Sequence, residues 1–111
     1  MQIAGQLRAT AHRMAESFAA RDFTRDDMHA MLTALVQRAN NGDAVDYAGA
    51  EQITMAIASI VYTLKTDGDL DGAQYAALKG GLDQCYAATQ KEDTYQPAAF
   101  VSAVNTIGRV S

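Results

Sequence analysis

The sequence predicts an all-α fold, an up-and-down bundle of about four helices followed by a shorter C-terminal helix, with turns near residues 22, 42, 68 and 93. Apolar residues recur at intervals of three and four, and no segment alternates apolar and polar residues for long as a strand would. Nine of the ten aspartates, all but Asp83, fall in expected turns or first helical turns, where capping and the helix dipole favour Asp. A chain of 111 residues has the commonest size of one domain, so residues 1–111 are expected to form a single bundle.

Two amphipathic helices are expected in the first part of the chain. Residues 2–20 place five apolar side chains in one sector of a helical wheel, namely Ile3, Leu7, Ala11, Met14 and Phe18. Thr24 can cap the free amides of the second helix, and Asp27 reaches back to it in a variant of the capping box. Phe23 and Met28 occupy the positions of a hydrophobic staple across the same helix start.

The third helix is expected to be the most buried. Gly42 can adopt the left-handed backbone conformation that ends the second helix, and a helical pattern resumes over residues 44–65. The main apolar stripe of this helix consists of Val45, Gly49, Ile53, Ile57, Ile60, Val61 and Leu64. A second apolar set, formed by Met55, Ala58 and Tyr62, lies on its other side. A helix that is apolar on two sides is usually central in a bundle.

Two further helices complete the predicted bundle. Asp71 and Gln74 have capping-box spacing and begin the fourth helix, while Pro97 suits the first turn of the last one. The mid-helix pair Gly80 and Gly81 should cost about 1 kcal/mol each relative to Ala, so close approach of a neighbouring backbone is expected there. The predicted buried sectors contain Tyr75, Leu78, Leu82, Cys85, Tyr86 and Thr89 in the fourth helix and Phe100, Val104 and Ile107 in the last.

Charge and hydropathy exclude several partners and locations. Nine Lys and Arg against 13 Asp and Glu give a net charge of -4, which opposes binding to nucleic acid. The most apolar stretch, residues 53–64, is shorter than the roughly 18 residues needed to cross a bilayer, so no membrane insertion is expected. Because the N-terminus lacks the pattern of a signal peptide and Cys85 has no partner for a disulfide, a cytoplasmic location is expected. A mature exported chain given a new Met would look the same.

The sharpest chemical motif is DxDxDG between the third and fourth helices, formed by Asp67, Asp69, Asp71 and Gly72. This pattern opens an EF-hand-like or dockerin-like calcium loop, in which alternate oxygens converge on a hard cation. The rest of the segment departs from the calcium-loop pattern. Gln74 occupies the position of an apolar residue, and Leu78 occupies the position of a bidentate acidic ligand. A solvated acidic turn with Asp71 as a helix cap is therefore favoured, and no metal or cofactor is predicted.

Other residues with catalytic chemistry are not expected to converge. The first two helices should be antiparallel neighbours, yet His12 and Glu16 lie away from the apolar stripe and His29 lies at a stripe edge. Cys85 falls in the buried sector of the fourth helix without basic neighbours, which indicates a small core residue. The sequence thus predicts no catalytic residue and no enzyme.

The function expected is that of a non-enzymatic interaction protein, such as a small regulator, inhibitor, immunity-type or accessory protein. If no helix of the same chain covers Met55, Ala58 and Tyr62, a protein partner or a second copy should cover them. Two alternatives remain open. One is a calcium-dependent structural module that uses the DxDxDG loop, and the other is a small apolar-ligand binder or enzyme with an interior cavity lined by Tyr62, Tyr75 or Tyr86.

Overall fold

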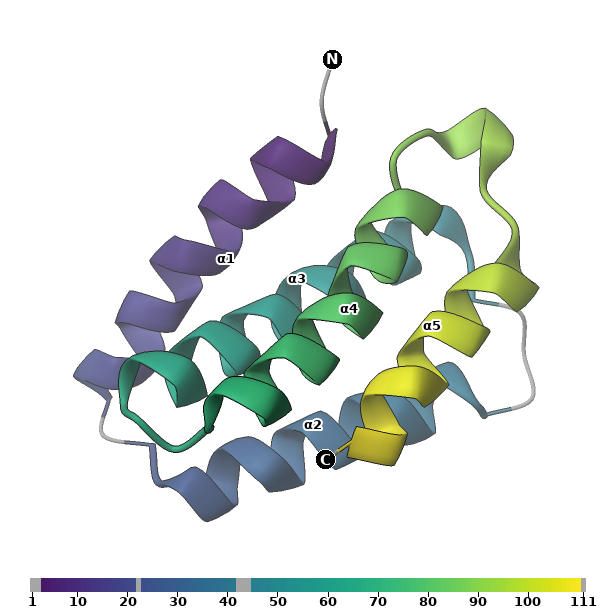
Figure 1. Cartoon of the computed structure of the whole chain (residues 1–111). Helices are drawn as coiled ribbons and strands as arrows, with labels where there is room; N and C mark the ends of the chain where they lie inside the picture. The colour runs from purple at the N-terminus through teal and green to yellow at the C-terminus, as the bar shows by residue number, and fades with distance from the viewer. Residues whose placement is uncertain (1–2, 22, 42–44, 111) are drawn as a thin grey trace.

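The computed structural model describes residues 3–21, 23–41 and 45–110, which form a bundle of helices (Figure 1). The elements in chain order are α1 (Ile3–Ala20), α2 (Arg25–Ala39), α3 (Tyr47–Thr66), α4 (Gly72–Ala88), the short 3-10 helix η1 (Glu92–Thr94) and α5 (Pro97–Val110). These described ranges contain no strand, and the predicted all-α bundle is confirmed. No helix within them is both long enough and apolar enough to cross a membrane.

The starts of α2 and α4 follow the predicted capping signals. The amide of Asp27 donates to Thr24 Oγ1 at 3.1 Å, and the amide of Thr24 donates to the Asp27 carboxylate at 3.1 Å. At the start of α4, the amide of Gln74 donates to Asp71 Oδ1 at 2.7 Å and the amide of Asp71 donates to Gln74 Oε1 at 3.2 Å. Both capping boxes are therefore confirmed, because each depends only on residues three apart in the sequence.

The start of α3 has a cap that the helical periodicity did not identify. Asp46 has extended backbone geometry, and its carboxylate accepts a hydrogen bond from the amide of Gly49 at 2.7 Å. This cap explains why the described helix begins at Tyr47. The predicted left-handed stop at Gly42 and the predicted helix start at Ala44 lie outside the described residues.

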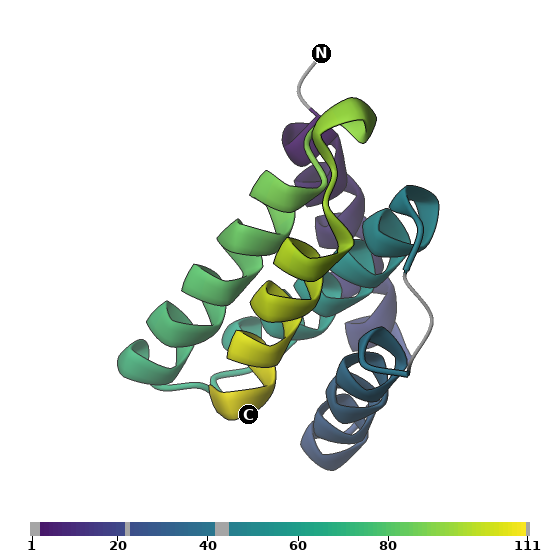
Figure 2. The same ribbon diagram turned by 90° about the vertical axis from the view of Figure 1, so that its right-hand side faces the viewer.

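Helix α3 lies at the centre of the bundle. Helices α1, α2 and α4 all pack against it, and α5 packs against α4 and α2 (Figures 1 and 2). Ten of its 20 residues are buried: Ala50, Ile53, Thr54, Ile57, Ala58, Ser59, Ile60, Val61, Thr63 and Leu64. The prediction that the third helix is the most buried is confirmed.

Helix α1 packs along α3 and makes little contact with α2. The ring of His12 stacks on that of Tyr62, and the hydroxyl of Thr63 donates to the carbonyl of Ala15 at 3.4 Å. Helices α1 and α3 run in the same direction, and their C-termini lie at the same end of the bundle (Figure 1). The prediction that the first two helices are antiparallel neighbours is therefore wrong, because the apolar face of α1 is buried on α3 instead.

The glycine pair in α4 has two different environments. A Cβ atom at Gly81 would lie 2.6 Å from Cγ1 and 3.4 Å from the backbone nitrogen of Ile107, so the missing side chain lets α5 approach α4 closely (Figure 2). The expected close approach is confirmed at Gly81, with α5 as the neighbour. A Cβ atom at Gly80 would meet no heavy atom within 4 Å. Packing among the described residues therefore does not account for Gly80.

Candidate functional site

The predicted partner-binding residues of α3 are largely covered by the chain itself. Ala58 is 0% exposed, so a partner cannot reach it in this structure, and the expectation of an open surface at this residue is wrong. Met55 and Tyr62 are half-buried and pack against the core. The Tyr62 ring lies against His12 of α1, with 4.4 Å between ring centroids. The role of Met55 and Tyr62 in binding a partner stays a prediction.

The DxDxDG residues form the connection between α3 and α4. Asp67 is the C-cap of α3, and Gly68 adopts a φ of 77°, which favours glycine. The carboxylate of Asp71 is occupied in the capping box of α4. Among the described residues, no three side chains of His, Cys, Asp or Glu gather as a metal site. The structure thus assigns Asp71 to helix capping.

The residues considered for catalysis lie on different elements. His12 and Glu16 line a groove between α1 and α3, whereas His29 is on α2. Nε2 of His29 is buried and has no hydrogen-bond partner among the described residues. Cys85 is buried in α4, and this burial raises the pKa of its thiol to about 12. A thiol that stays protonated near neutral pH is a poor nucleophile.

The three tyrosines considered as cavity walls have different surroundings. Tyr62 lines the groove between α1 and α3. Tyr75 lies beside Lys65, whose Nζ is 4.3 Å from the ring centroid. Tyr86 is 2% exposed, and the guanidinium of Arg8 lies 4.7 Å from its ring centroid. Burial raises the pKa of the Tyr86 hydroxyl. These rings therefore have separate structural roles.

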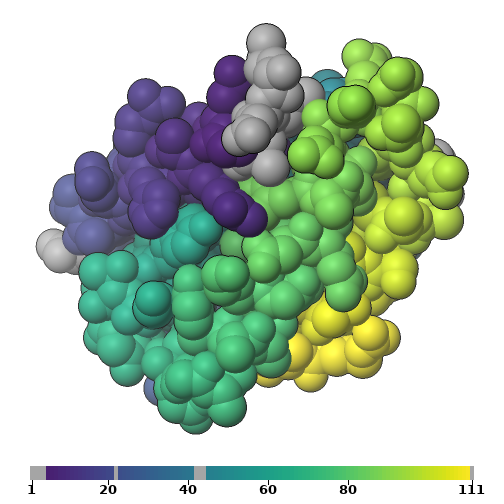
Figure 3. Space-filling view, turned by 45° about the horizontal axis from the view of Figure 1, so that its top comes forward, coloured from purple at the N-terminus to yellow at the C-terminus, as the bar shows by residue number. Residues whose placement is uncertain are grey.

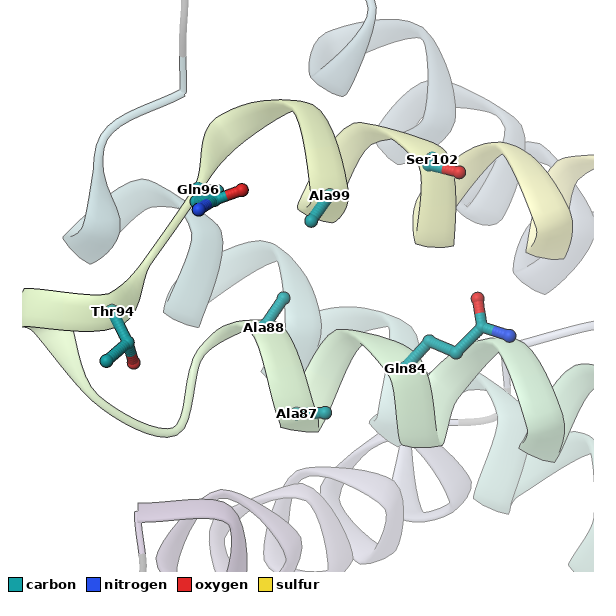
Figure 4. Close-up of a pocket in the computed structure, with 7 residues that line it drawn as sticks. All are labelled: Gln84, Ala87, Ala88, Thr94, Gln96, Ala99 and Ser102. Carbon is teal, nitrogen blue, oxygen red and sulfur yellow. The ribbon is translucent and has the colours of Figure 1, made fainter.

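An open groove of about 490 Å³ lies between α4 and α5 (Figure 4). Its lining residues are Gln84, Ala87, Ala88, Thr94, Gln96, Ala99 and Ser102. Ala88 and Ala99 point into the space between the two helices, and Gln84 extends toward α5 (Figure 4). None of these lining side chains is charged. The groove therefore presents methyl groups and neutral hydrogen-bonding groups.

The outer face of α4 continues this uncharged surface. Five exposed residues follow one another at intervals of four, three, four and three positions, and we call them the α4 seam: Ala73, Ala77, Gly80, Gln84 and Ala87. Figure 3 shows α4 on the surface between α1 and α5. The charged residues of α4 are Lys79 and Asp83, whose side chains lie 3.3 Å apart, and Asp83 also pairs with Arg8 at 3.0 Å. The seam has the spacing of a helix-pairing face.

The α4 seam was missed in the sequence because Ala occurs on buried and exposed helix faces alike. Gly80 is the residue that could have indicated the seam, because glycine in a helix interior is unfavourable unless a neighbouring backbone approaches it closely. No family model, no curated protein and no solved structure matches the chain. A function must therefore be argued from the side chains themselves and their arrangement.

Proposed function

We propose that this chain is a non-enzymatic interaction protein that pairs with a second copy of itself through the α4 seam. The observation that carries the proposal is Gly80, which is exposed in the middle of a helix and has no heavy atom near the position of its missing Cβ. A glycine in a helix interior costs about 1 kcal/mol relative to Ala. Gly81 offsets that cost through the contact with α5, and an approaching second helix would offset it at Gly80.

The seam is nearly symmetric about Gly80, which favours a second copy as the partner. Ala73 and Ala87 lie seven positions before and after Gly80, while Ala77 and Gln84 lie three before and four after. In an antiparallel pair whose two-fold axis passes Gly80, Ala73 of one copy meets Ala87 of the second copy. Gly80 and the alanines then face small residues of the second copy, except where Ala77 meets Gln84, so the two backbones can approach closely at Gly80.

This pairing also brings together the charged residues beside the seam. Lys79 and Asp83 lie on one flank of α4, and the same two-fold axis keeps that flank of both copies on one side of the contact. The order along the flank is then Asp83, Lys79, Lys79 and Asp83, so each Lys79 has Asp83 of the second copy as one neighbour and the other Lys79 as the second. The uncharged groove between α4 and α5 shares Gln84 and Ala87 with the seam, so a paired helix would lie beside it.

The mass of the protein in solution, measured by sedimentation equilibrium, tests this function. The wild-type chain is expected at twice 11.9 kDa at micromolar concentration. Gly80→Leu should give the monomer mass, because the side chain fills the contact while the monomer has space for it. Ala34→Leu, a similar enlargement at an exposed position of α2, should leave the dimer intact.

A wild-type mass of 11.9 kDa at every concentration would contradict the proposal. A Gly80→Leu dimer as tight as the wild type would also contradict it. Far-ultraviolet circular dichroism verifies that each variant keeps its helices, so a loss of dimer can be distinguished from a loss of fold.

A further inference from the structure

A second groove, of about 230 Å³, lies between α1 and the C-terminal half of α3. Its lining residues are His12, Ala15, Glu16, Ala19, Tyr62, Thr63, Thr66 and Asp67, and none of them belongs to the α4 seam. Alanine and threonine methyl groups supply apolar surface, and the Tyr62 ring, stacked on His12, supplies an aromatic wall. The side chains of Glu16 and Asp67 are exposed, so the groove combines apolar walls with two carboxylates.

The helix ends make this groove electronegative. Because α1 and α3 run parallel, their C-terminal ends lie together (Figure 1), and Ala19 and Thr66 of those last turns line the groove. The C-terminus of a helix carries about half a negative charge. The two ends therefore add to the charges of the two carboxylates.

The basic side chains described near this groove form no ion pair with its two carboxylates. Among the described residues, neither Glu16 nor Asp67 forms an ion pair. Lys65, the basic residue in the last turn of α3, has its Nζ 4.3 Å from the centre of the Tyr75 ring. Arg21 follows α1 but is not among the residues that line the groove. The negative charge is thus available to a ligand.

We propose that the groove between α1 and α3 binds a small primary ammonium ion that carries a short alkyl chain. The ammonium group pairs with Glu16 and Asp67, and the alkyl chain covers the alanine and threonine methyl groups beside Tyr62. A volume of 230 Å³ is below the range of about 300 to 1,000 Å³ that suits drug-sized ligands, so the alkyl chain is limited to a few carbons. This binding does not depend on pairing through the α4 seam.

Titration with n-butylammonium chloride, followed by amide chemical shifts in ¹H–¹⁵N spectra, tests the site. Saturable shifts are expected at residues 12–19 and 62–67, with a dissociation constant on the order of 1 mM for so small a ligand. Sodium chloride at equal ionic strength should not reproduce these shifts, and 1-butanol should bind more weakly because it lacks the charge.

Charge-removing variants identify the carboxylates that hold the ligand. Glu16→Gln and Asp67→Asn should each weaken binding about two- to five-fold, as expected for exposed ion pairs. Asp26→Asn removes an exposed acid on α2 and should leave binding unchanged. The proposal is overturned if no localised shifts occur, if 1-butanol binds equally well, or if neither groove variant weakens binding while circular dichroism shows intact helices.

Discussion

Alanine substitutions at Gly80 and Gly81 should separate two glycines that are adjacent in the sequence. Each substitution gains about 1 kcal/mol of helix propensity. At Gly80 nothing opposes this gain, because a Cβ atom there meets no heavy atom within 4 Å. Gly80→Ala should therefore raise the free energy of unfolding by about 1 kcal/mol.

At Gly81 the new methyl group would lie 2.6 Å from Cγ1 of Ile107, which is closer than real Cβ contacts. The backbone nitrogen of Ile107 would lie 3.4 Å away, at the limit of ordinary contact, so the overlap is with Cγ1 in the middle of the Ile107 side chain. Overpacking of this kind costs about 1–3 kcal/mol. After the propensity gain of about 1 kcal/mol, Gly81→Ala should lower the free energy of unfolding by about 0–2 kcal/mol.

Urea unfolding followed by circular dichroism measures this difference. The protein concentration should be low enough to keep the chain monomeric, because Gly80 also lies in the proposed contact. The two variants should differ by about 1–3 kcal/mol with equal denaturant slopes, since the propensity gain cancels between them. Equal stabilisation of both variants would refute the close approach of α5 to Gly81.

Four further predictions concern the helix cap of α2, the carboxylate of Asp27, the buried thiol and the contact between α2 and α5. Thr24→Ala should lower the free energy of unfolding by about 1 kcal/mol in urea melts. Hydrogen bonds from the backbone and side chain of Thr24 lower the pKa of Asp27 from 3.8. The Asp27 carboxylate therefore stabilises the fold above pH 3.8, and this stabilisation is lost as the pH falls through the lowered pKa. The free energy of unfolding measured as a function of acid pH tests this dependence. Cys85 should react with a thiol reagent far more slowly in the folded protein than in urea, because burial raises its pKa to about 12; equal rates would contradict its burial. The side-chain amides of Asn40 and Asn105 exchange two hydrogen bonds of 2.8 and 3.0 Å. A double-mutant cycle with Ala at both positions should give a coupling free energy of about 0.5–1 kcal/mol. A coupling free energy near zero would count against this contact.

Local signals predicted the helix boundaries well. Thr24 and Asp71 begin α2 and α4 as expected, because a capping box requires only residues three positions apart. Pro97 begins α5 for a similarly local reason, since its missing amide is not needed in a first turn. Such features need no knowledge of the tertiary structure.

The pairing of helices could not be predicted in the same way. The predicted stripe with Leu7, Ala11 and Met14 indicates that one face of α1 is buried, but it does not say which helix covers it. The same ambiguity made Ala58 a candidate surface residue, although neighbouring helices bury it completely. The α4 seam was missed for the converse reason, since alanines at helical spacing fit an exposed face as well as a core.

Disulfide cross-linking of Gly80→Cys is the most direct measure of whether two copies meet at Gly80. Residues on a two-fold axis face their own counterparts, and a disulfide requires Cα atoms about 4.4–6.8 Å apart. The native Cys85 is buried, so the introduced thiol is the reactive one. Mild oxidation should convert Gly80→Cys into a linked dimer much faster than Ala34→Cys, an exposed position of α2. Equal rates of linkage for the two variants would contradict pairing through the α4 seam.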